Sequence, residues 1–136
     1  MSILRFPYLF KKIDSEVIAD PTVPLEIETS FGYRKIFFLV DSGADATTLP
    51  LKKYQNLFGL DIKKITRTRI GGIEGKGIYG YLKELKFRFG KEVFGIRCYF
   101  VESDIMPLLG RLDIWDKFTI VFDNMKQEVI FRPILK

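Results

Sequence analysis

The sequence predicts a mostly β fold, and three observations carry this prediction. Thirteen Phe and six Tyr, together with many Ile, Leu and Val, favour strands because such side chains suit a pleated surface. Eleven Gly and six Pro supply frequent turns. The chain has 136 residues, 47% of them hydrophobic, so it is long enough to bury one core and too short for two. We therefore expect a single domain over residues 1–136.

The first clear strand lies over residues 25–29, where apolar or small side chains alternate with glutamate, the period of a half-buried strand. Gly32 permits a tight turn after it. Residues 36–40 form a continuous apolar run, which we interpret as a strand buried on both faces. This strand ends at Asp41. Residues 1–24 show no clear pattern.

The middle of the chain is predicted to contain a short helix and a long hairpin. Residues 50–54 favour the helix, with Pro50 at its first position and Gly59 beyond its end. A strand over residues 65–70 leads into residues 71–77, which contain four glycines. Because this segment joins two β-like segments, we expect a mobile hairpin there.

The last third of the chain continues as paired strands. Aromatic and aliphatic residues occupy odd positions in the returning strand, namely Tyr79, Tyr81, Leu85, Phe87 and Phe89. A turn at Gly90 and Lys91 precedes a strand over residues 93–101. Residues 112–118 are expected to form a short helix, and residues 119–131 a final hairpin that turns at residues 124–127.

The residue types present disfavour several kinds of active site. The chain has no histidine and one cysteine, Cys98, which we interpret as a small buried hydrophobic residue in a strand. One cysteine forms no internal disulfide, and without histidine a zinc hydrolase site, a Ser-His-Asp triad and a Cys-His pair are disfavoured. Carboxylates remain as acid and base groups, and we expect no metal and no cofactor.

The net charge is +5, but Lys and Arg are scattered along the chain rather than gathered into a basic block. We therefore expect a solvated basic surface and no nucleic-acid partner. No apolar run approaches the roughly 20 residues that a membrane span needs, and the N-terminus lacks the apolar core of a signal peptide. The expected location is cytoplasmic, with no membrane partner.

An Asp-Ser-Gly sequence follows the apolar run, at Asp41, Ser42 and Gly43. In such a sequence the glycine lets the backbone approach a neighbouring chain or a substrate, and the hydroxyl can bond across it. Alone, the tripeptide favours an ordinary turn, where such sequences are common. The rest of the chain therefore decides how it is interpreted.

Three motifs follow one another along the chain. The first is the hydrophobic strand that leads into Asp41, Ser42, Gly43, Ala44 and Asp45. The second is the glycine-rich segment Ile70, Gly71, Gly72 and Ile73, continued by Glu74 and Gly75. The third is Pro107, Leu108, Leu109, Gly110 and Arg111. In this order they resemble the retropepsin family, the single-domain aspartic proteases of retroviruses and their cellular and bacterial relatives. The resemblance covers about residues 23–131 and looks closest to the prokaryotic branch.

This resemblance implies a single-domain, closed antiparallel β fold with a short helix after Gly110 and Arg111 and a glycine-rich flap hairpin. It also implies an active site assembled across the two-fold axis of a homodimer. Pepsin-like enzymes carry two Asp-Ser-Gly sequences in one chain, and this chain carries one. The second aspartate is therefore expected from an identical partner.

The resemblance assigns Asp41 as the catalytic carboxylate of an aspartic endopeptidase. Two adjacent carboxylates share one proton, because both cannot ionise cheaply. The ionised member takes a proton from a bound water, which attacks the peptide carbonyl, and the protonated member assists the carbonyl oxygen and then the leaving amine. A non-catalytic dimer that binds extended peptides or a partner protein in the same cleft remains as the alternative.

The same resemblance gives supporting roles to neighbouring residues. Ser42 is expected to bond across the dimer axis, and Gly43 to let substrate backbone approach. Asp45 is expected to bind substrate backbone and to pair with Arg111. The flap is expected to close over a peptide that binds in extended form, with Ile73 at its tip.

The sequence departs from the viral pattern in two places. Viral members place Asp or Asn directly after Gly-Arg, whereas this chain has Leu112 there and Asp113 next. Extra residues at the N-terminus and a complete final hairpin indicate a differently built dimer interface. We expect residues 130–134 to contribute to it, because an apolar terminal strand would otherwise be an exposed edge.

Overall fold

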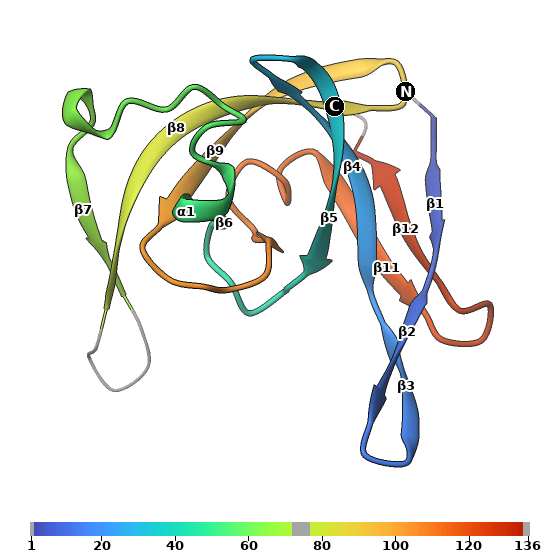
Figure 1. Ribbon diagram of the computed structural model, residues 1–136. Helices are drawn as coiled ribbons and strands as arrows, with labels where there is room; N and C mark the ends of the chain where they lie inside the picture. Colours follow the sequence, from blue (N-terminus) through green and yellow to red (C-terminus); the bar gives the residue numbers. More distant parts are fainter. Residues whose placement is uncertain (1, 72–76, 135–136) are drawn as a thin grey trace.

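The computed structural model describes residues 2–71 and 77–134 (Figure 1). Its strands are β1 Leu4–Pro7, β2 Leu9–Ile13, β3 Glu16–Asp20, β4 Thr22–Thr29, β5 Gly32–Val40, β6 Thr47–Pro50, β7 Arg67–Ile70, β8 Ile78–Phe89, β9 Glu92–Val101, β10 Leu108–Leu109, β11 Phe118–Asp123 and β12 Glu128–Pro133. The helical segments are α1 Leu51–Tyr54 and a single 3-10 turn, Ile62–Lys64. The prediction of a mostly β fold is confirmed.

Seven of the strands form a sheet that closes on itself. Their order is β4-β5-β10-β6-β9-β8-β7, and β8 also pairs with β4 where Ile27 lies opposite Phe87. The predicted closure is therefore confirmed. Two pairings are parallel, β10 with β5 and β6 with β9, so the sheet is not wholly antiparallel. The pair of β10 with β5 joins segments far apart in the sequence, because the chain crosses over and inserts β10 between β5 and β6.

The strand that leads to Asp41 has one face in the core and one face open. Ile36, Phe38 and Val40 of β5 are buried, whereas Phe37 is 51% exposed. The interpretation of residues 36–40 as buried on both faces was wrong at Phe37. In a closed sheet only the inward-pointing side chains of a strand reach the interior, and alternate residues point outward.

A second sheet, with the order β1-β12-β11, packs against the closed one. Phe89 of β8 joins them, because its ring lies 4.9 Å from that of Phe118 and 5.9 Å from that of Phe131, centroid to centroid. β12 is the central strand, and Phe131 lies opposite Leu4 on one side and Ile120 on the other. The reason for expecting residues 130–134 in a dimer interface was therefore wrong, since β1 already covers the edge that was expected to be exposed. Their contribution to a dimer stays a prediction.

The short helix predicted over residues 112–118 is not formed. Consecutive turns replace it, in which the N–H of Trp115 donates to the carbonyl of Arg111 and that of Phe118 to Ile114, both over 3.0 Å. Asp113 has a φ of 66°, which a right-handed helix does not accept. The helix predicted over residues 50–54 is present as α1, and Gly59 beyond it has a φ of +58°.

The hairpin predicted around residues 71–77 has its two strands in place. β7 and β8 pair from Arg67↔Tyr81 to Ile70↔Ile78, so the chain returns between them. Ile70 and Gly71 lie at the end of β7. The other predicted flap residues, Gly72, Ile73, Glu74 and Gly75, lie outside the described residues.

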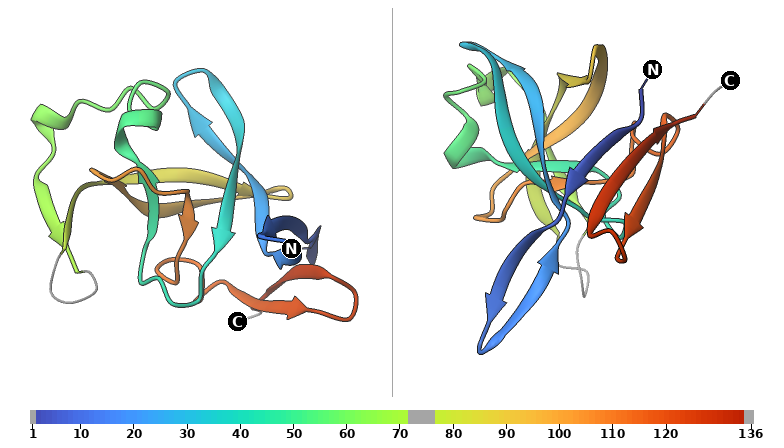
Figure 2. Two further views of the ribbon diagram at one scale, coloured as in Figure 1. Left: turned by 60° about the horizontal axis from the view of Figure 1, so that its bottom comes forward. Right: turned by 90° about the vertical axis from the view of Figure 1, so that its right-hand side faces the viewer.

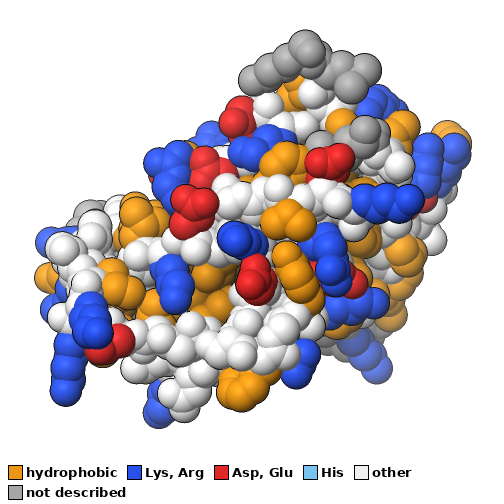
Figure 3. Space-filling view, turned by 90° about the horizontal axis from the view of Figure 1, so that it is seen from above, with side chains coloured by type: hydrophobic (Ala, Val, Ile, Leu, Met, Phe, Trp, Pro, Cys, Tyr) orange, Lys and Arg blue, Asp and Glu red, His pale blue; other side chains and the backbone are white. Residues whose placement is uncertain are grey.

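Basic side chains are distributed over the surface rather than gathered. On the face seen in Figure 3, Lys and Arg lie singly or in small groups among acidic, apolar and uncharged groups. This distribution agrees with the solvated basic surface expected from the sequence. Within the described part of the chain, no helix has the length and apolar character needed to cross a membrane.

Candidate active site

Asp41 lies directly beyond β5, in a partly buried position. Its N–H donates to the carbonyl oxygen of Leu109 over 3.0 Å, and the N–H of Val40 donates to that of Pro21 over 3.0 Å. Leu109 reaches this position because β10 pairs in parallel with the end of β5. Segments before and after Asp41 in the sequence therefore fix where its carboxylate lies.

The Asp-Ser-Gly sequence forms a turn that holds one oxygen of this carboxylate. The N–H of Gly43 donates to Oδ1 of Asp41 over 2.9 Å, and the N–H of Ala44 donates to the carbonyl of Asp41 over 3.2 Å. Ser42 and Gly43 are exposed. A Cβ at position 43 would lie 3.3 Å from Oδ1, so the glycine suits a close approach. The turn leaves the Ser42 hydroxyl in reach of solvent or a partner.

The predicted pair between Asp45 and Arg111 is present. A guanidinium nitrogen of Arg111 donates to Oδ1 of Asp45. The backbone adds two further bonds, from the N–H of Arg111 to the carbonyl of Ala44 over 3.0 Å and from the N–H of Leu112 to that of Asp45 over 2.9 Å. Because the Asp45 side chain is 92% exposed, solvent screens the ion pair. The backbone bonds therefore contribute more to anchoring the loop.

Gly110 lies against the loop where no side chain fits. A Cβ there would stand 2.4 Å from both the carbonyl carbon and the carbonyl oxygen of Ala46. The N–H of Gly110 donates to the buried hydroxyl of Thr47 over 3.2 Å. Gly110 and Arg111 thus hold the far end of the loop, as the structural role predicted for them requires.

One ion pair near this site, between Arg97 and Asp113, was not predicted from the sequence. The carboxylate of Asp113 accepts from Nε, Nη2 and the backbone N–H of Arg97, each over 2.9 Å. The hydrogen bonds from the Arg97 side chain are the main reason why the pKa of Asp113 lies below its ordinary value. A spacing of sixteen residues between an exposed Arg and an Asp carries no signal in the sequence.

A second side-chain contact holds strand β7, which leads into the predicted flap. Arg67 donates to Glu102 from Nε over 2.7 Å and from Nη2 over 3.0 Å, and its guanidinium lies 3.7 Å from the ring centroid of Tyr79. The hydrogen bond from Arg67 is the main cause of the lowered pKa of Glu102. Strand β7 is therefore tied to the loop that follows β9. No pattern in the sequence predicted this contact.

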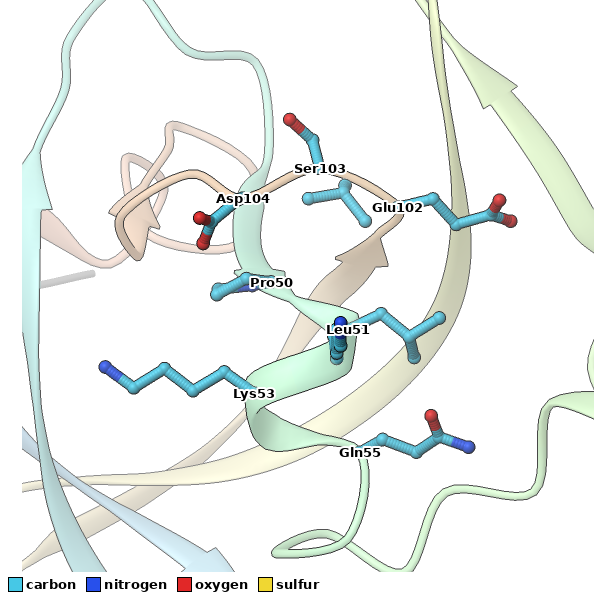
Figure 4. Close-up of a pocket in the computed structure, with 9 residues that line it drawn as sticks. Pro50, Leu51, Lys53, Gln55, Glu102, Ser103 and Asp104 are labelled. Carbon is cyan, nitrogen blue, oxygen red and sulfur yellow. The ribbon is translucent and has the colours of Figure 1, made fainter.

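Two hollows of the described structure differ in how they lie to the predicted site. One, of about 560 Å³, is lined by residues 50–53, by Gln55 and by residues 101–104, and Figure 4 shows Lys53 and Asp104 extending to one side of it and Glu102 to the other. None of the predicted site residues lines this hollow. The other, of about 320 Å³, is an apolar groove that includes Val40 and Ser42, the neighbours of Asp41.

The arrangement offers one partly exposed carboxylate held by backbone hydrogen bonds. Asp45, the other carboxylate of the loop, is engaged by Arg111. Among the described residues, no three His, Cys, Asp or Glu side chains come together in a way that would hold a metal ion. A carboxylate can accept a proton from water, but a pair that shares one proton needs a second carboxylate from outside this loop.

The structure is similar to those of two proteins of known structure. One is a retropepsin-like aspartic protease from Rickettsia conorii, with a TM-score of 0.64 and 22% identity over 96% of this chain and 91% of that chain. The other is EIAV protease in complex with the inhibitor HBY-793, with a TM-score of 0.51 and 22% identity over 68% of this chain and 82% of that chain. No protein-family model matches the sequence, and no curated protein matches it significantly.

Proposed function

From its retropepsin-like fold, we propose that the chain is one half of a homodimeric aspartic endopeptidase, with the active site shared between two copies of Asp41. The observation that carries this proposal is the setting of Asp41. Asp41 follows a core strand, its N–H donates to the carbonyl of Leu109, and an intact Asp-Ser-Gly turn leaves its carboxylate partly exposed. Because the chain carries one Asp-Ser-Gly sequence, it would supply one of the two carboxylates of such a site.

In the proposed dimer, the two Asp41 carboxylates share one proton and bind a water between them. The ionised member takes a proton from this water, and the oxygen attacks the carbonyl carbon of the substrate peptide. The protonated member donates to the carbonyl oxygen, and a proton then passes to the leaving amine. The products are a carboxylic acid and an amine, so the peptide bond is hydrolysed without a metal or a cofactor.

The remaining residues of the loop and the flap would bind the substrate. An extended peptide would add as a strand, with its backbone against Gly43, Ala44 and Asp45 on one side and the flap at Ile70 and Gly71 on the other. The exposed Ser42 hydroxyl would bond to the partner's loop. We propose that the chain acts as a single protease domain and works in a reducing compartment such as the cytoplasm, which suits a protein with one buried thiol.

Replacing Asp41 tests this function. Asp41→Asn keeps an acceptor for the Gly43 N–H, so we expect it to fold and dimerise like the wild type. It should cleave a peptide library at least about 1,000-fold more slowly, because it removes the acid and base of the site. Asp61→Asn is the control, since Asp61 is exposed and accepts from the Lys63 N–H in a similar turn. Wild-type cleavage by Asp41→Asn would refute the mechanism.

The same assay distinguishes an endopeptidase from the alternative, a dimer that binds peptides without cleaving them. A pepstatin-type inhibitor mimics the tetrahedral intermediate, so an endopeptidase should lose its activity in its presence. A binding module would show no hydrolysis by the wild type at any pH from 4 to 7, and its peptide affinity would be the same in Asp41→Asn.

A further inference from the structure

Residues 9–20 form a two-stranded ribbon, here called the arm, that stands apart from both larger sheets. β2 and β3 pair from Leu9↔Asp20 to Ile13↔Glu16 and form a sheet of their own. Figure 1 and the right-hand view of Figure 2 show the arm projecting beyond the rest of the molecule. A two-stranded hairpin is only marginally stable alone in water, so the arm is expected to pack against a further surface.

The arm carries apolar side chains on both faces. Residues directly opposite each other share a face, which places Phe10, Lys12, Val17 and Ala19 together. The large apolar side chains are Leu9 at 41% exposure, Phe10 at 52%, Ile13 at 50%, Val17 at 66% and Ile18 at 37%. Soluble monomers rarely expose contiguous apolar surface of this kind. The face with Phe10 and Val17 carries the most exposed of these side chains.

The base of the arm is fixed to the body of the molecule at both ends. On the β2 side, the Tyr8 hydroxyl donates to Oδ1 of Asn124 over 2.7 Å, and its N–H donates to the carbonyl of Gln127 over 2.8 Å. On the β3 side, the carbonyl of Pro21 accepts from the N–H of Val40, the residue before Asp41. The direction of the arm is therefore coupled to the position of the active-site loop.

The arm projects toward the place where a second copy has to lie. β5 runs downward in Figure 1 and ends before Asp41, and the arm extends further in the same direction. If two copies of Asp41 meet, the two-fold axis passes beside their loops, and the partner lies beyond the loop. An element that projects past the loop on this side enters the space of the partner. This step rests on the proposed function.

The groove beside Ser42 offers a surface that fits the arm. Its apolar lining includes Trp115, Phe122 and Ile134, which are 46%, 38% and 39% exposed. Because Val40 and Ser42 also line the groove, it opens beside the same axis.

We infer that the arm clasps a second copy of this chain, with the face of Phe10 and Val17 seated in that copy's groove beside Ser42. Two-fold symmetry makes the contact reciprocal, so one dimer contains two such contacts. Each arm covers apolar surface on both chains, and it does so next to the residues that form the shared site. The arm thus stabilises the arrangement in which the two Asp41 loops face each other.

Charged substitutions on the arm test this inference by sedimentation velocity. The double substitution Phe10→Asp, Val17→Asp should raise the dimer dissociation constant by at least about 100-fold and lower cleavage in parallel at low protein concentration. The matched control is Phe31→Asp, Val93→Asp, which alters side chains of 64% and 47% exposure. Phe31 lies in the β4–β5 turn and Val93 near the start of β9, at the end of the molecule opposite the arm. The control should sediment like the wild type.

A cross-link identifies the partner surface directly. Val17→Cys and Phe122→Cys are purified separately and then mixed under mild oxidation, and Cys98 does not interfere because it is buried. A disulfide between chains is expected in the mixture and in neither single variant. This measurement does not depend on how well the charged variants fold.

The outcomes of these experiments distinguish a failure of the arm inference from a failure of the proposed function. If the charged arm variant dimerises and cleaves like the wild type, or if dimers form without the cross-link, the arm inference is wrong and the function stands. If the wild type cleaves nothing but its dimer depends on the arm, the function is wrong and the arm inference stands without its catalytic context. If the wild type is a monomer at every concentration, both are wrong.

Discussion

Gly110 stands so close to Ala46 that a Cβ at position 110 would lie 2.4 Å from the carbonyl of Ala46. Because this contact is with backbone, it cannot be relieved by moving a side chain. We expect Gly110→Ala to displace the active-site loop and to lower the free energy of unfolding by about 2–4 kcal/mol. Urea unfolding at one fixed protein concentration would measure this.

Gly71→Ala is the control for this substitution, since no described atom lies within 4 Å of a Cβ built there. It should change the free energy of unfolding by less than about 0.5 kcal/mol. Equal stability of Gly110→Ala and Gly71→Ala would show that the loop can move away from Gly110 at little cost.

The ion pair between Asp45 and Arg111 should contribute little to stability. Its carboxylate is 92% exposed, and the loop keeps the backbone bonds from Arg111 and Leu112 without it. A double-mutant cycle with Asp45→Ala and Arg111→Ala is expected to give a coupling energy of about 0.2–1 kcal/mol. A coupling energy above about 2 kcal/mol would mean that the side-chain pair, rather than the backbone, anchors the loop.

The pair between Asp113 and Arg97 should make stability depend on pH. The pKa of Asp113 is lowered in the folded chain, chiefly by the hydrogen bonds from Arg97. The Asp113 carboxylate is therefore protonated more readily in the unfolded chain than in the folded one. The stabilisation is therefore present above the unfolded pKa of about 3.9 and is lost as the pH falls through the folded value. We expect Asp113→Asn to be less stable than the wild type at pH 7, and the difference to shrink below about pH 4.

Urea midpoints from pH 3 to pH 7 would test this expectation. Asn suits the positive φ of position 113, so the substitution removes charge with little backbone strain. Asp116→Asn is the control, because its carboxylate is 62% exposed and pairs with the neighbouring Lys117 over 3.4 Å. A difference between wild type and Asp113→Asn that stays constant over the whole range would contradict the assignment.

The Cys98 thiol should be unreactive while the chain is folded. It is buried in β9, and burial raises its pKa well above the ordinary value, so the thiolate is scarce at neutral pH. We expect labelling by a thiol reagent to follow the fraction of unfolded chain in urea. Rapid labelling of the native protein would show that the closed sheet opens locally at β9.

The sequence predicted those features that depend on neighbours in the chain. The strand before Asp41, α1 with Gly59 beyond it and the return of β7 into β8 all follow from local period and turn residues. The pairing of Asp45 with Arg111 was reached through the resemblance to retropepsins, and the structure shows it. Local signals and the resemblance together thus predicted how the loop over residues 41–45 is held.

Features set by distant parts of the chain could not be predicted. Asp113 has a backbone conformation outside the right-handed helical region, and its carboxylate accepts hydrogen bonds from Arg97 of β9. β12 is a central strand because β1 pairs with it, more than 100 residues away in the sequence. In the arm, apolar and polar residues do not alternate along the sequence, because apolar and charged side chains occur on both of its faces. Each of these outcomes depends on a tertiary partner that composition and spacing do not reveal.

The pairing of β1 with β12 also orders events during synthesis. Residues 4–7 are made more than 100 residues before residues 128–133, the strand that lies beside them. Until then, β1 and β11 both lack the neighbour that joins them, and the Tyr8 N–H lacks its acceptor at Gln127. A nascent chain therefore cannot complete the base of the arm before residues 128–133 have been made, so a dimer contact made by the arm, as inferred above, would form only after that point.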